Sequence, residues 1–143
     1  MIFFKWGNAM YNDEIFSTSD PLNRNIILKS TTWNDHIKPR HNECDIDAIK
    51  TNIENPTYIL VNTKPEKDGS TVKIVDNTRQ DYIGLTIIEN KLHVIKTIVE
   101  FENCSNGCIV TNHILRKANE INTIGGVIYD RCKDQNTTEF INL

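Results

Sequence analysis

The chain has 143 residues, of which 38% are hydrophobic and 24% are charged, and its formal net charge is -3 at pH 7. This length fits one domain, and the hydrophobic fraction is too high for a disordered chain. The small negative charge gives no sign of the basic patch typical of duplex-DNA-binding proteins. Apolar runs are too short for a membrane helix of about 20 residues, and Lys5 interrupts the first too early for a signal peptide. We therefore expect a cytoplasmic protein without membrane contact.

A single domain is expected, because the length leaves little room for a second. We divide residues 1–143 into an N-terminal extension at 1–30, a core at 31–130 and a polar tail at 131–143. Apolar runs at 2–6 and 25–29 are typical of short strands.

Two short helices are predicted after the extension. The first begins near Thr32 with a capping-box-like pattern and ends or kinks at Pro39. The second begins near Asp45 and stops at Asn55-Pro56. One face of the second helix is apolar and carries Ile46, Ile49 and Ile53.

From Thr57 onward, apolar and polar residues alternate with the period of two that is typical of strands. We expect strands at 57–61, 71–75, 82–88, 92–101 and 108–111, with turns between them. The apolar spacing then indicates a helix at 113–121 and a last strand at 127–129. The predicted class is α+β, with N-terminal strands and a helical pair packed on a four- to five-stranded antiparallel sheet.

Two of the four cysteines, Cys104 and Cys108, have a spacing that could suit a zinc knuckle, but a second pair of ligands is missing. We therefore interpret this segment as a turn and all four cysteines as reduced thiols. Neither a metal nor a cofactor is expected.

A cluster of basic side chains is the candidate for chemistry: His36, Lys38, Arg40 and His41. On an uninterrupted helix the two histidines would point about 140° apart. Since Pro39 breaks the helix, both can face one cleft. Two histidines can remove and supply protons, and an arginine can stabilise a developing negative charge. These are the groups that metal-free cleavage of an RNA phosphodiester requires. The alternative is that His36 is a packing histidine beside Trp33.

The run His36-Ile37-x-x-Arg40-His41 resembles the opening segment of a group of phage-borne nuclease-like domains, relatives of the barnase, EndoU, colicin E5/D and RelE nucleases. Like them, the chain continues with an amphipathic helix that ends at Asn55-Pro56, a following strand, and a late strand that ends in Val110-Thr111. The resemblance spans about 26–115 and implies a fold with a helical pair before an antiparallel sheet. The chain departs from the family at Asn112-His113, which could bring a third histidine near the cleft or end the strand differently.

The resemblance implies that Thr111 positions the phosphate. Lys96 interrupts an apolar row of its strand, so it either holds phosphate or is an edge lysine. Tyr82 could stack on a base or pack in the sheet. The remaining candidates for substrate binding are Lys38, His113 and Arg116.

The first functional hypothesis is a metal-independent endoribonuclease, a toxin or phage effector whose substrate is RNA. His36 and His41 would be its base and acid in either order, assisted by Arg40, Lys96 and Thr111. A cognate antitoxin or immunity protein is an expected partner, and the oligomeric state is left open. The alternative is a non-catalytic binding module, either an immunity or antitoxin-like protein or an inactive relative of such nucleases.

Overall fold

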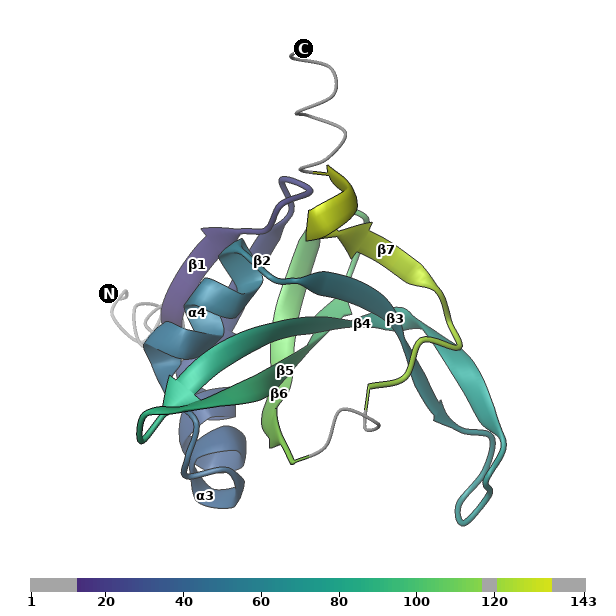
Figure 1. Cartoon of the computed structure of the whole chain (residues 1–143), viewed down its shortest axis with the longest axis horizontal. Helices are drawn as coiled ribbons and strands as arrows, with labels where there is room; N and C mark the ends of the chain where they lie inside the picture. The colour runs from purple at the N-terminus through teal and green to yellow at the C-terminus, as the bar shows by residue number, and fades with distance from the viewer. Residues whose placement is uncertain (1–12, 117–120, 135–143) are drawn as a thin grey trace, which may run out of the picture.

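The computed structural model describes residues 13–116 and 121–134. Seven strands form one sheet: β1 (Glu14–Ser19), β2 (Asn25–Lys29), β3 (Tyr58–Pro65), β4 (Lys73–Ile88), β5 (Lys91–Phe101), β6 (Asn106–Leu115) and β7 (Val127–Asp130). The helices are α2 (Ser30–Thr32), the π-helical turn η1 (Trp33–Ile37), α3 (Lys38–Arg40) and α4 (Ile46–Glu54). Figure 1 shows the β3–β4 hairpin extending away from the helices. No helix in these ranges is long and apolar enough to cross a membrane.

The strand order is β1-β2-β6-β5-β4-β3-β7, and every neighbouring pair is antiparallel except β2 with β6. The α+β class is therefore confirmed, whereas a four- to five-stranded antiparallel sheet understates a mixed sheet of seven strands. The difference arises because β1 and β2 extend the sheet beyond β6 (Figure 1). The strand expected at 2–6 lies outside the described residues.

The prediction of a helix at 113–121 is wrong for the residues of this range that the structure describes. β6 continues to Leu115, because His113, Ile114 and Leu115 pair in register with β5. Residues 121–123 are not helical, and 117–120 lie outside the description. The apolar spacing suited a helix, but pairing with a long neighbouring strand prevailed. The strands expected at 71–75 and 82–88 likewise belong to the single long strand β4.

Helix α4 forms as its sequence predicts. The Asp45 side chain caps it by accepting a hydrogen bond of 3.0 Å from the Ala48 backbone N–H. Ile49 and Ile53 are fully buried on its apolar face. The helix packs against β1, β4 and β5 and approaches β4 closely at Gly84, where an added Cβ would lie 2.2 Å from the Asn52 Oδ1.

Residues 30–40 form one continuous helical segment whose centre is the π-helical turn. Here the Lys38 backbone N–H donates to the Trp33 carbonyl instead of to a carbonyl four residues earlier. Ile37 is fully buried and Trp33 packs against the core, so the segment is anchored beside β6. Pro39 follows the π turn, and the segment ends at His41.

Helix α4 covers one face of the sheet near its centre, and the opposite face carries several charged and polar side chains. Thr97 shares the face covered by α4, since its hydroxyl accepts a hydrogen bond from Asn52. Strand side chains alternate between faces, so Lys96 and its direct partner His113 lie on the opposite face. We call this opposite face, which carries Asp81, Lys96, Thr111 and His113, the polar face.

Candidate functional site

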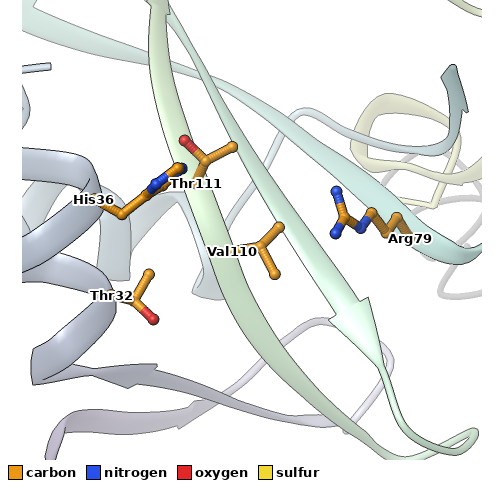
Figure 2. A pocket seen from close by; sticks show the side chains of 5 residues that line it. All are labelled: Thr32, His36, Arg79, Val110 and Thr111. Atoms are coloured by element: carbon orange, nitrogen blue, oxygen red, sulfur yellow. The ribbon is translucent and has the colours of Figure 1, made fainter. Parts of the chain in front are cut away.

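His36 and Thr111 line the same cavity, which has a volume of about 320 Å³. The other lining residues are Thr32, Arg79 and Val110. Figure 2 shows His36 and Thr111 side by side, with the Arg79 guanidinium turned toward them from β4. The Thr111 Oγ1 is buried and has no hydrogen-bond partner in the described structure. Such a buried hydroxyl without a partner is uncommon in folded proteins.

A β-bulge in β6 explains why two adjacent residues line this cavity. Thr111 pairs with Ile98 and Ile109 pairs with Val99, so Val110 has no partner on β5. The extra residue bends the strand and changes the direction of the side chains beside it. Val110 and Thr111 both border the cavity. Bulges and π turns both occur frequently at functional sites, and this cavity has one on each side.

His41 lies against His113, with ring centroids 4.5 Å apart and ring planes at 71°. These two histidines border a second cavity of about 510 Å³, whose other lining residues are Arg40, Glu43, Ile114, Leu115 and Arg116. Since Thr111 and His113 are two residues apart on β6, they lie on the same face about 6.6 Å apart along the strand. The two cavities are therefore neighbours, each with one histidine from the helical segment or its end.

The pKa of His113 lies below its usual value of 6.5. Burial is the main cause, because the imidazolium loses hydration. His41, Lys96 and His36 lower this pKa further, and Glu43 partly opposes them. His113 is therefore favoured in its neutral form, which can accept a proton or a hydrogen bond near pH 7.

Lys96 is held by a buried carboxylate. Its Nζ lies 3.7 Å from the Asp81 Oδ2, and its side chain retains 19% exposure against 3% for Asp81. The Asn62 Nδ2 donates a 2.7 Å hydrogen bond to the other carboxylate oxygen. Burial raises the pKa of Asp81, and Lys96 and Asn62 oppose that shift. Lys96 is thus a half-buried lysine in the interior of the sheet, between β4 and β6, rather than an edge lysine.

A buried chain of hydrogen bonds supports the site from the α4 side. The Asn52 Nδ2 donates to the Thr97 Oγ1 at 3.0 Å, and this hydroxyl donates to the Asn112 Oδ1 at 2.6 Å. The Asn112 Nδ2 in turn donates to the Cys44 Sγ at 3.0 Å. Burial raises the pKa of Cys44, which favours the neutral thiol. Because Asn112 stands between Thr111 and His113, this network fixes β6 relative to the segment that follows His41.

The structure thus distributes the predicted site residues unequally. His36 and Thr111 border the first cavity, whereas His41, which was expected to face the same cleft as His36, borders the second with Arg40, His113 and Arg116. Lys96 pairs with His113 across the β5–β6 pair and borders a further cavity. Lys38 is exposed and borders none of the cavities described here.

Assigning Tyr82 to substrate binding was wrong, because its side chain is fully buried on the α4 side of the sheet. Its hydroxyl donates to the Asp20 Oδ2 at 2.5 Å and accepts a hydrogen bond from Arg24 at 3.1 Å. Burial and Asp20 raise the pKa of this phenol. The alternative that Tyr82 packs in the sheet is therefore the correct one.

Sequence reasoning missed Arg79 and Asp81. Arg79 forms an ion pair with Glu100, with 3.2 Å between Nε and Oε2. Both missed residues lie on β4, two strands from β6, so only the pairing register shows that Asp81 lies in line with Thr111. No sequence signal marked either residue, because both precede the strand expected at 82–88.

Within the described residues, the cysteines form no disulfide and the possible metal ligands do not cluster. All four cysteines are free, with Cys104 in the turn before β6 and Cys108 within that strand. Across 13–116 and 121–134, no group of three or more His, Cys, Asp or Glu side chains is placed to hold a metal ion. Comparison with known proteins found no matching family model, curated protein or solved structure.

Proposed function

We propose that the protein is a metal-independent endoribonuclease whose active site lies on the polar face. The observation that carries the proposal is the gathering of three histidines around β6. His36 shares a cavity with Thr111, and His41 contacts His113. Arginines border both cavities, Arg79 in the first and Arg40 in the second. The resemblance to the barnase, EndoU, colicin and RelE group supports the same reading.

The proposed reaction needs one proton acceptor and one proton donor around a single phosphate. His36 and His41 supply these two functions. The neutral imidazole removes the proton from the ribose 2′-OH, and the 2′ oxygen attacks the phosphorus. The phosphorus–O5′ bond breaks, and the protonated imidazole transfers its proton to O5′. The products are a 2′,3′-cyclic phosphate and a 5′-hydroxyl.

The other polar groups stabilise and position the phosphate. A guanidinium can donate two parallel hydrogen bonds to phosphate oxygens, which suits Arg79 and Arg40. The unpartnered Thr111 Oγ1 can donate a further hydrogen bond. Lys96 adds positive charge from the neighbouring strand. His113 contacts the His41 ring and assists it by orienting it.

A substrate with a single ribose tests this chemistry directly. An oligonucleotide of deoxynucleotides with one ribonucleotide should be cut after that ribonucleotide and leave a 2′,3′-cyclic phosphate. The fully deoxy oligonucleotide should remain intact because it lacks the attacking hydroxyl. Cleavage of both oligonucleotides would contradict attack by the 2′-OH.

The alternative function is a non-catalytic module that binds a protein partner. It is supported by apolar side chains near the tip of the β4–β5 hairpin, where Leu85, Ile87 and Leu92 are each more than half exposed. An inactive protein that binds a toxin would leave RNA intact at any protein concentration. The ribonucleotide assay therefore separates the two functions.

A further inference from the structure

A third cavity, of about 480 Å³, is bordered by Lys96, which lies on the polar face. It is lined by Thr63, Lys73, Lys96, Ile121, Asn122, Thr123 and Ile124, which come from β3, β4, β5 and the segment before β7. Lys96 stands directly opposite His113 across the β5–β6 pair. Lys96 therefore connects this cavity with the proposed active site.

The lining of the third cavity combines positive charge with neutral hydrogen-bonding groups. Lys73 and Lys96 supply the charge. Lys96 is paired with Asp81, whereas Lys73 forms no ion pair within the described residues. The Asn122 Oδ1 accepts a hydrogen bond from the Ile124 backbone N–H at 2.9 Å, which leaves the amide NH₂ available. Thr63 and Thr123 add hydroxyls that donate or accept.

We propose that this third cavity binds the nucleotide next to the scissile phosphate of a single-stranded RNA, an inference that rests on the proposed function. Lys96 borders this cavity and pairs directly with His113, and paired residues of neighbouring antiparallel strands lie about 5 Å apart. A chain held at the histidines can therefore reach this cavity with its next nucleotide. The lysines bind its phosphate, and the amide and hydroxyl groups contact its ribose or base.

The β3–β4 hairpin carries a matched control for Lys73. Lys73 pairs with Pro65, whereas Lys64 pairs with Ile74, so the two lysines project from opposite faces of the same hairpin. Both are exposed. The Lys64 Nζ lies 3.8 Å from the Asp76 Oδ2, and Lys64 borders none of the three cavities. Replacing either removes one positive charge from one hairpin, but only Lys73 borders the third cavity.

The test measures binding of a fluorescent 2′-O-methyl RNA oligonucleotide, which has no free 2′-OH and cannot be cut. Lys73→Ala should weaken binding roughly fivefold and reduce the salt dependence by about one phosphate contact, while Lys64→Ala should match the wild type. Equal effects of both substitutions, no effect of either, or no binding by the wild type would overturn the proposal. Circular dichroism checks that both variants are folded.

A cleavage assay in parallel keeps the two proposals distinguishable. If the wild type cuts RNA but Lys73→Ala behaves like Lys64→Ala, this inference fails while the nuclease assignment stands. If the wild type binds the oligonucleotide through Lys73 but never cuts RNA, the third cavity remains a binding site and the nuclease assignment fails.

Discussion

His41 and His113 meet edge to face, with ring centroids 4.5 Å apart, although one ends the first helical segment and the other lies near the end of β6. The contact joins the two parts of the chain that supply the proposed catalytic groups. It also explains why His41 is one of the neighbours that lower the pKa of His113.

The first prediction concerns the ionisation of His113. NMR titration should give this ring a pKa below 6.5, chiefly through burial. In His41→Ala the pKa should rise, because a nearby positive charge is removed. An unchanged or lower pKa in that variant would contradict the coupling of the two rings.

The same depressed pKa predicts a pH dependence of stability. The unfolded chain binds a proton at His113 more readily than the folded chain does. The contribution of His113 is therefore fully present above about pH 6.5 and is lost as the pH falls toward the folded pKa. Urea unfolding at about pH 7.5 and about pH 5.5 should show a smaller loss on acidification for His113→Gln than for the wild type. Equal losses would exclude this contribution.

The second prediction concerns the proposed acid and base. His36→Ala and His41→Ala should each lower the cleavage rate by a factor on the order of 10²–10⁴, with the fold retained. His93→Ala is the control, because His93 lies on β5 with its side chain on the other face from Lys96. Rates should be measured on one RNA oligonucleotide, with circular dichroism of each variant. A loss of rate in His93→Ala as large as in the other two would argue for a structural cause.

The third prediction concerns Asp81, whose carboxylate holds Lys96 and accepts a hydrogen bond from Asn62. Asp81→Ala should lower the free energy of unfolding by about 1–3 kcal/mol, because it leaves the Asn62 donor buried without a partner. Asp81→Asn should cost less, since its amide oxygen can still accept that hydrogen bond. Urea unfolding of both variants provides the measurement, and equal stability of the two would contradict the assigned bond.

The fourth prediction concerns the buried network behind the active-site strand. Asn112→Ala should destabilise the fold by about 1–3 kcal/mol, because Thr97 and Cys44 lose their partner in the core. Asn103→Ala, in the exposed turn before β6, is the control and should destabilise the fold less. The Asn103 Oδ1 accepts hydrogen bonds from the backbone N–H groups of Ser105 and Asn106 in the same exposed turn. A similar loss in both variants would mean that the network has no special role.

The sequence predicted the features that depend on local chemistry. The Asp45 cap and the burial of Ile49 and Ile53 follow from spacing along α4. The turn between β4 and β5 follows from Glu89-Asn90, which both adopt positive φ, as a two-residue hairpin turn requires. The helical segment that carries His36 was likewise expected, but it begins at Ser30 without the expected side-chain cap, Pro39 lies within it, and its π turn was not predicted.

Features that depend on pairing between distant strands could not be predicted in this way. The parallel pairing of β2 with β6 gives no periodic signal, so the N-terminal strands were not expected to extend the main sheet. The bulge at Val110 exists only relative to the register of β5. The position of Arg79 at the cavity of His36 also depends on strand pairing and could not be predicted, whereas the possibility that His113 lies near the other histidines was noted from the sequence. The sequence indicated the histidines by residue type, whereas the residues opposite them on neighbouring strands became known only from the strand pairing.

The most direct test of the central claim compares the wild type with the His36→Ala, His41→Ala double variant on RNA in the presence of EDTA. We expect the wild type to cleave the RNA and leave 2′,3′-cyclic phosphate ends, and the folded double variant to leave the RNA intact. Cleavage by the double variant at the wild-type rate, or wild-type activity that disappears in EDTA, would contradict it.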